Sequence, residues 1–254
     1  KMINCISNIA WEKSNSLEIF PMLRDRGVKY IEVAPLEIFD DWENLKFNKI
    51  KSFKQICDSH SLKIASMQSI FYKKDLNIFK DSVESANHIR LIYSILEDLE
   101  CDYCVFGAPK CRKTNLSTDE SYKRFNNLLN TLPENITIGI ESNPAQYGTN
   151  FINNYEQNTY FFENYVNKDN VKIHLDIGCH LMSETNSLET FQKAIKYASN
   201  HVHLSKPMLR TFYETSEQEK ELLDLVKNKN VSIEMKKTPL KDLEGIIKKY
   251  FKGE

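Results

Sequence analysis

The chain has 254 residues, 41% of them hydrophobic, and its 34 Lys and Arg against 35 Asp and Glu give a formal net charge of −1. This balance argues against the electropositive surface of proteins that bind nucleic acid or anionic membranes. No apolar run reaches the roughly 20 residues of a membrane span, and the opening segment KMINCISNIAW lacks the apolar stretch of a secretory signal. We therefore expect a cytoplasmic protein with no nucleic-acid or membrane partner.

Short β-branched runs alternate with longer amphipathic stretches along the whole chain. We predict strands at residues 3–7, 30–34, 63–67, 102–106, 136–141, 171–176, 201–205 and 231–234. Helices are predicted at residues 16–26, 47–59, 80–99, 118–132, 155–166, 188–198, 214–226 and 240–251. Two helix starts carry local signals: Ser117 and Glu120 predict a capping box, and Thr238 before Pro239 predicts a cap followed by a first-turn proline.

Eight alternations of strand and helix favour one closed barrel. Alternation implies a parallel sheet, and about 250 residues is the usual length of a (β/α)8 barrel. An open doubly wound sheet, the main alternative, usually has a glycine-rich first turn. This chain has seven glycines and no GxGxxG motif. The sequence therefore predicts an α/β fold, a single (β/α)8 TIM barrel domain over residues 1–254.

Six cysteines occur at irregular spacing, several of them within predicted strands: Cys5, Cys57, Cys101, Cys104, Cys111 and Cys179. This pattern predicts reduced, buried thiols rather than a disulfide framework. Cys101 and Cys104 with Cys111 could suggest zinc, but no second ligand pair completes such a site, which favours burial.

Four consecutive predicted strands in the second half end on, or carry near their end, a potential metal ligand: Glu141, Asp176, His203 and Glu234. In a barrel of this type the carboxyl ends of the strands converge. One acid at a strand end could simply cap a helix, but three buried carboxylates together would repel each other without a cation. The set predicts one divalent metal ion, Mn²⁺ before Co²⁺, Mg²⁺ or Zn²⁺, because a nitrogen ligand suits transition metals.

Several segments resemble a known family. IESNPAQYGTNF, HLDIG, HVHLSKP and SIEMK, with ASMQSIF and VFGAPK, are similar to the sugar phosphate isomerase/epimerase family of xylose isomerase-like TIM barrels. The resemblance covers residues 3–234 and is strongest from residue 136. It implies that Glu141, Asp176, His203 and Glu234 bind one divalent metal, and that His201 is structural.

The sequence also departs from the family pattern after the sixth strand. Many relatives have a substrate-contacting His three residues after the Asp, where this chain has Cys179. His180, one position later, is either a substrate contact or a surface histidine that opens a helix. Lys206 stands where relatives often have an acid, so it either reads a negatively charged substrate or is a solvated loop lysine.

Other polar residues at strand ends are candidates for binding substrate. Gln68, Lys110 and Asn143 join His180 and Lys206 in this set. Glu32 and Arg112 are further polar residues near strand ends. A lysine or arginine at a barrel mouth could hold phosphate or carboxylate, although exposed basic loop residues are common.

The expected chemistry is proton transfer next to a carbonyl, with Glu141 and Glu234 as catalytic carboxylates and a metal-stabilised enediolate. The same site serves an epimerase or an aldose–ketose isomerase acting on a sugar or sugar phosphate, as a monomer or homodimer. Two alternatives remain: a non-catalytic sugar-binding barrel, and an abasic-site endonuclease-like metal hydrolase. Such endonucleases resemble one another in carrying more histidines than the six found here.

Overall fold

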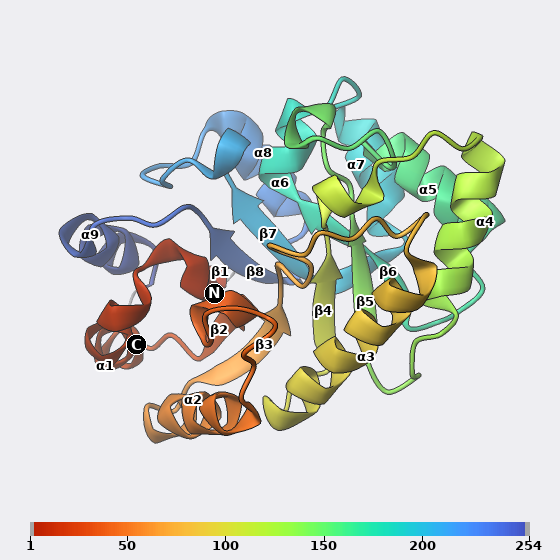
Figure 1. Cartoon of the computed structure of the whole chain (residues 1–254). Helices are drawn as coiled ribbons and strands as arrows, with labels where there is room; N and C mark the ends of the chain where they lie inside the picture. The colour runs from red at the N-terminus through yellow and green to blue at the C-terminus, as the bar shows by residue number, and fades with distance from the viewer. Residues whose placement is uncertain (1–2, 252–254) are drawn as a thin grey trace.

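The computed structural model describes residues 3–251, and its strands form a closed barrel in the order β1 to β8 with all neighbouring pairs parallel (Figure 1). The strands are β1 (Ile3–Ser7), β2 (Tyr30–Val33), β3 (Lys63–Met67), β4 (Tyr103–Phe106), β5 (Thr137–Glu141), β6 (Val171–Asp176), β7 (Ala198–Ser205) and β8 (Asn230–Glu234). The predicted (β/α)8 barrel is confirmed.

Helices surround the barrel on the outside (Figure 1). They are α1 (Ser16–Asp25), α2 (Phe47–Ser59), α3 (Ser82–Asp98), α4 (Thr118–Leu129), α5 (Tyr155–Asn164), α6 (Ile177–Met182), α7 (Leu188–Ile195), α8 (Glu217–Leu225) and α9 (Leu240–Tyr250). The short α6 was not predicted, because Asp176 ends β6 and caps this helix at the same time by accepting a hydrogen bond from the Cys179 amide. Within residues 3–251, no helix is long and apolar enough to cross a membrane.

The start of β7 and the cap of α9 differ from the prediction. Strand β7 starts at Ala198, which had been assigned to the preceding helix, and Ala198 pairs with Ile173 of β6. Small residues carry little strand preference of their own, so pairing with the neighbouring strand decides their conformation. Thr238 does not cap α9: the N-cap is Pro239, and the Thr238 hydroxyl donates to a backbone carbonyl.

The capping box also lies elsewhere than predicted. The Ser117 hydroxyl accepts a hydrogen bond from the Glu120 amide, but the reciprocal bond is not formed. Both bonds are present between Ser216 and Glu219 at the start of α8. Glu219 is thereby held in a buried position, where it pairs with Lys206.

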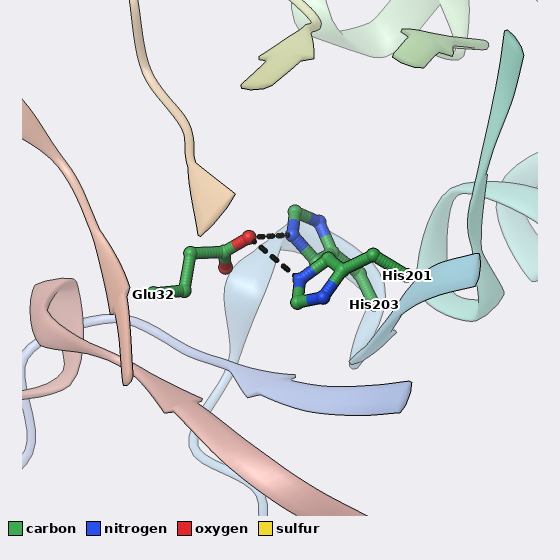
Figure 2. Close-up of side chains that lie close together, drawn as sticks. All are labelled: Glu32, His201 and His203. Atoms are coloured by element: carbon green, nitrogen blue, oxygen red, sulfur yellow. Dashed lines mark hydrogen bonds and ion pairs between the residues drawn. The ribbon is translucent and has the colours of Figure 1, made fainter. Parts of the chain in front are cut away.

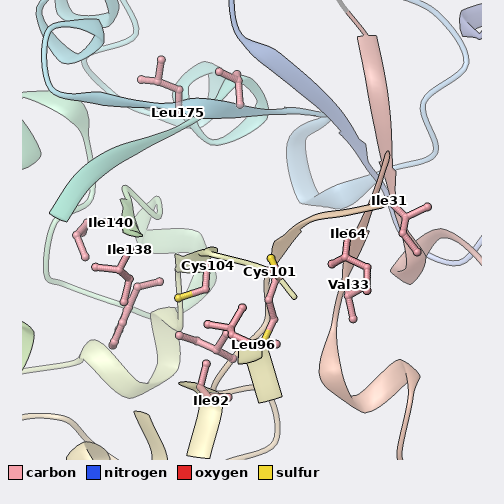
Figure 3. Close-up of a cluster of buried hydrophobic side chains, with 14 of the residues drawn as sticks. Ile31, Val33, Ile64, Ile92, Leu96, Cys101, Cys104, Ile138, Ile140 and Leu175 are labelled. Carbon is pink, nitrogen blue, oxygen red and sulfur yellow. The ribbon is translucent and has the colours of Figure 1, made fainter. Parts of the chain in front are cut away.

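The hydrophobic core fills the space between strands and helices, and Figure 3 shows part of this cluster. All six cysteines are buried and unpaired, as predicted. Burial raises the pKa of the Cys57 and Cys101 thiols to about 12 each, so both are protonated near neutral pH.

The interior of the barrel is not purely apolar. Buried polar side chains from β2, β3, β6, β7 and β8 lie there: Glu32, Ser66, His174, His201 and Ser232. Most barrels of this type fill the interior with branched apolar residues. Gly139 belongs to the same region, because a Cβ atom at this position would lie 2.0 Å from the hydroxyl of Tyr103, which contacts His174 Nδ1 at 2.8 Å.

Candidate metal centre

Four side chains from consecutive strands converge at the carboxyl end of the barrel. Glu141 ends β5, Asp176 ends β6, His203 lies in β7 and Glu234 ends β8. Each offers one ligand atom, these atoms lie within 4.8 Å of one another, and all four residues are buried. The structure thus brings together the whole set that the sequence predicted as metal ligands.

The ring of His203 turns one nitrogen toward all three carboxylates. Its Nδ1 lies 3.2 Å from Glu234 Oε2, 3.4 Å from Glu141 Oε1 and 3.6 Å from Asp176 Oδ2. These are ion-pair distances, but none has hydrogen-bond geometry, so Nδ1 is a buried nitrogen without a hydrogen-bond partner. One nitrogen and three carboxylates form a donor set that fits a divalent transition metal.

The pKa values of Glu234 and His203 in this cluster are strongly shifted. Burial raises the pKa of Glu234 to about 8, the negative charges of Asp176 and Glu141 add to this, and His203 opposes it. Burial disfavours a charged His203 ring, but the carboxylates of Glu32 and Glu234 outweigh it and hold the pKa of His203 well above its usual value. Buried carboxylates that compete for one proton are the charge pattern of a cation site.

Asp176 is fixed by two donors on one oxygen. Its Oδ1 accepts hydrogen bonds from the Cys179 amide at 2.8 Å and from the Ser205 hydroxyl at 2.7 Å. The other oxygen, Oδ2, faces His203. The carboxylate is therefore oriented before any ligand arrives.

Glu141 is held from the β4 side. Asn143 Nδ2 donates to Glu141 Oε2 at 2.6 Å, and the Arg112 guanidinium donates to Asn143 Oδ1 and, at 3.0 Å, to the Glu141 carbonyl. Arg112 is fully buried, which lowers its pKa to about 10, so it keeps its charge near neutral pH. A Cβ atom at Gly107 would lie 2.7 Å from Glu141 Oε2, so a larger residue here would displace this carboxylate.

Among the described contacts, none joins Lys110 or Lys206, the two lysines predicted to contact substrate, to the carboxylate cluster. Lys110 is exposed on the short 3-10 helix Pro109–Arg112. Lys206 Nζ lies 2.6 Å from Glu219 Oε2 of α8 and 4.9 Å from the centre of the Phe212 ring. Arg112 is the cation that supports Glu141, and its place in the sequence does not distinguish it from Lys110.

His180 is a packing residue within α6. Its ring stacks on Tyr155, with centroids 5.2 Å apart, and packs against Phe191 at 5.1 Å. Burial lowers the pKa of His180 to about 4. The surface position considered from the sequence is therefore wrong, and these contacts give no support to a substrate contact.

A second polar group lies on the other side of His203 (Figure 2). Glu32 Oε2 accepts from His203 Nε2 at 2.7 Å and from His201 Nε2 at 3.0 Å. Gln68 joins this group rather than standing free for substrate, since its Nε2 lies 3.1 Å from Glu32 Oε1 and 2.6 Å from Ser7 Oγ. The Glu32–His203 contact joins non-adjacent strands across the barrel, so no spacing in the sequence predicts it.

Tyr147 follows the candidate ligand Glu141 along the chain and carried no signal of its own in the sequence. It lies in the 3-10 helix Ala145–Tyr147, a few residues after Glu141, and is half-buried. Burial raises its pKa, and the negative charges of Asp176, Glu141 and Glu234 raise it further. Its hydroxyl is therefore within electrostatic range of the cluster, in a segment (PAQYG) whose only signal was its place after a ligand strand.

This chain is similar to known proteins in sequence pattern and in fold. The family model described as xylose isomerase-like TIM barrel matches residues 20–211. An AP endonuclease, family 2, from Brucella melitensis has a TM-score of 0.76 at 13% identity, with 98% of this chain and 99% of that chain covered. Comparison with curated protein sequences gave no match.

Two further solved structures are similar at low identity. D-psicose 3-epimerase from Clostridium cellulolyticum H10, crystallised with D-tagatose, has a TM-score of 0.69 at 14% identity, covering 97% of this chain and 89% of that chain. IolI protein with a zinc atom has a TM-score of 0.65 at 16% identity, covering 96% and 92%. At these identities the likeness establishes the shared fold.

Proposed function

The chain belongs to the family of xylose isomerase-like TIM barrels, and on this premise we propose that it is a divalent-metal-dependent epimerase or isomerase of a sugar or sugar phosphate. The observation that carries the proposal is the buried cluster in which Glu141 and Glu234 accompany one histidine nitrogen and Asp176. The similar D-psicose 3-epimerase, crystallised with D-tagatose, and the similar zinc-containing IolI protein support the substrate class and the need for a metal.

Glu141, Asp176, His203 and Glu234 would hold the metal ion. When bound, a divalent cation stabilises negative charge that develops on a carbonyl oxygen, which is worth several kcal/mol in the transition state. The nitrogen ligand favours Mn²⁺, Co²⁺ or Zn²⁺ over Ca²⁺.

The two glutamates would move the proton. A hydrogen next to a sugar carbonyl is weakly acidic, so a carboxylate must lie within reach of it. Glu141 and Glu234 come from β5 and β8, with two strands between them, so they approach a bound sugar from different sides. One carboxylate takes the proton and the other returns a proton to the opposite face, which inverts the centre.

If one glutamate alone reaches the substrate, it carries the proton between adjacent carbons and gives an aldose–ketose isomerisation. Asn143 and the buried Arg112 support this role for Glu141, because they fix the carboxylate that must meet the carbon-bound hydrogen.

A metal-dependent hydrolase of the abasic-site endonuclease type is the second candidate, because the Brucella protein shares the fold. Such enzymes resemble one another in using a histidine-rich cluster of three metals. Here His88 and His180 are buried in helices, and His201 is bonded to Glu32. His174 Nδ1 contacts the Tyr103 hydroxyl at 2.8 Å, and His60 is the C-cap residue of α2. The remaining ligand set suits one metal, which favours the isomerase.

The test follows hydrogen isotopes. Ketopentoses, ketohexoses and their phosphates are incubated in D₂O with Mn²⁺-loaded protein and with the Glu141→Gln and Glu234→Gln variants. We expect solvent deuterium at the inverted carbon and a loss of roughly 10²–10⁴ in turnover for each variant. One variant should still exchange the hydrogen without inverting the centre, because the remaining carboxylate serves one face.

The exposed Glu12, which pairs with Lys237 on the surface, supplies the matched control. Glu12→Gln should turn over at the wild-type rate. Conversion without any deuterium uptake would refute the two-glutamate inversion, in which the returned proton comes from solvent. Sugar binding without conversion of any substrate would identify a non-catalytic barrel.

A further inference from the structure

The buried carboxylate of Glu32 lies behind the metal-binding face of His203. We propose that Glu32 is a positioning residue of the metal centre, which fixes the His203 ring so that Nδ1 is presented to the cation. This inference rests on the proposed function, since it requires a metal at the cluster of Glu141, Asp176, His203 and Glu234.

The geometry assigns the two nitrogens of the His203 ring to different partners. Nε2 lies 2.7 Å from Glu32 Oε2, whereas Nδ1 faces the carboxylates of the cluster at 3.2 to 3.6 Å. Glu32 belongs to β2 and His203 to β7, so this contact spans the barrel interior (Figure 2). A ring anchored from across the barrel cannot flip without breaking the contact to Glu32.

Every side chain that bonds to Glu32 can act as a donor to it. Oε2 contacts His203 Nε2, His201 Nε2 and the Ser66 hydroxyl, and Oε1 contacts Gln68 Nε2 at 3.1 Å and the Ser232 hydroxyl at 3.4 Å. An ionised carboxylate can only accept hydrogen bonds, so the hydrogen on His203 lies at Nε2. A neutral ring of this tautomer carries its lone pair at Nδ1, which is the form that binds metals.

The donors also explain how a carboxylate is tolerated at this position. Glu32 is fully buried, and an uncompensated charge there would be strongly destabilising. Ser66 contacts Glu32 and His201 at once, and His201 contacts the same oxygen as His203. These side chains hold Glu32 itself in place, so the orientation of the metal ligand depends on an ordered group of barrel-interior residues.

The first experiment measures metal affinity without any substrate. Metal-free wild-type protein and the Glu32→Gln variant are titrated with Zn²⁺ and Mn²⁺ against a competing chelator. Loss of a partner behind a metal-binding histidine typically weakens metal binding roughly 10- to 100-fold, and we expect this loss in Glu32→Gln. Glu32→Asp, which keeps the charge, should recover part of the affinity.

The matched control removes another buried carboxylate that has its own cationic partner. Glu219 is buried and paired with Lys206, and no described contact joins it to His203. Glu219→Gln should lower stability while keeping the wild-type metal affinity. A role for Glu32 in folding alone predicts the same behaviour for both variants, so wild-type metal affinity in folded Glu32→Gln would overturn the proposal.

A second measurement uses the wild-type protein and does not depend on a folded variant. With ¹⁵N-labelled histidine and Zn²⁺, long-range NMR spectra should show His203 with a hydrogen at Nε2 and a zinc-shifted Nδ1. A hydrogen at Nδ1 would overturn the proposal. Wild-type protein that binds no metal would refute both this inference and the proposed function. Weakened metal binding in Glu32→Gln, with no turnover of any sugar by wild type, would support Glu32 and refute only the proposed function.

Discussion

The two ring nitrogens of His203 face carboxylates with very different numbers of hydrogen-bond donors. On the Nε2 side, the single carboxylate of Glu32 receives donors from five side chains. On the Nδ1 side, three carboxylates face one ring nitrogen. The first group is balanced by the protein's own hydrogen bonds, whereas the second has more acceptors than donors and needs a cation.

This difference decides which cluster is the better candidate for a metal site. Proximity alone would also group Glu32 with His201 and His203 as possible ligands. Both histidines, however, turn Nε2 toward Glu32 at hydrogen-bond distance and therefore offer it a hydrogen rather than a lone pair. Counting donors against acceptors separates a hydrogen-bonded group from a metal centre where distances alone do not.

The largest expected effect comes from removing a ligand on the cation side. His203→Ala and Asp176→Asn should lose bound metal, and turnover should fall by roughly 10³-fold or more, because the cation supplies several kcal/mol. Metal analysis of purified protein checks the first point and initial rates the second. His201→Gln, on the Glu32 side, should still reach one metal per chain at saturation. Wild-type metal content in His203→Ala would remove the distinction between the two sides.

Much of the fold was readable from the sequence. The bounds of β1, β3 and β6 match the predicted ranges, because β-branched runs flanked by polar turns are strong local signals. The convergence of the four candidate ligands could be predicted for the same reason, since each ends a strand or lies near its end and the ends of parallel strands meet.

The partners of these residues could not be predicted. Glu32 and His203 are 171 positions apart and contact each other only because the closed barrel brings β2 and β7 across its interior. Lys206 was visible as a basic residue beside a ligand strand, but its pairing with Glu219 depends on how α8 packs. Burial and partner are tertiary properties, so a residue type at a strand end predicts chemistry and not contacts.

An intermediate effect, on stability, is expected from replacing Lys206. Its charge is paired with the buried Glu219, as the buried Glu32 is paired with its donors. Lys206→Met leaves the buried Glu219 without its cationic partner, with only the Ser216 amide, among the described contacts, still donating to its carboxylate. This should lower the free energy of unfolding by about 3 kcal/mol, the low end for such pairs because Lys206 is 17% exposed. Urea unfolding measures this loss, and the double variant with Glu219→Gln should recover part of it. The ratio of KM values for phosphorylated and neutral sugars should not change; a selective rise for the phosphorylated sugar would instead assign Lys206 to substrate recognition.

The smallest expected effect is a pH dependence of the free energy of unfolding that originates outside both carboxylate groups. His88 of α3 is buried, with Nε2 2.6 Å from the Ile70 carbonyl, and burial lowers its pKa from 6.5 to about 4. The unfolded chain therefore takes up a proton at this residue at higher pH than the folded chain does. The resulting stabilisation is complete above pH 6.5 and is lost progressively as the pH falls toward 4. Between pH 7 and pH 5 this amounts to on the order of 2 kcal/mol.

Urea unfolding at these two pH values is best measured in the His203→Ala background, where the shared histidine of both carboxylate groups no longer titrates. Adding His88→Gln should reduce the remaining loss of stability between pH 7 and pH 5, because a glutamine amide can still donate to the Ile70 carbonyl but takes up no proton in this range. If His203→Ala alone abolished the pH dependence and His88→Gln left it unchanged in the wild-type background, the proton uptake would belong to the barrel interior. The Glu32 side and the Nδ1 side of His203 would then differ in cation binding, but both would contribute to the loss of stability at low pH.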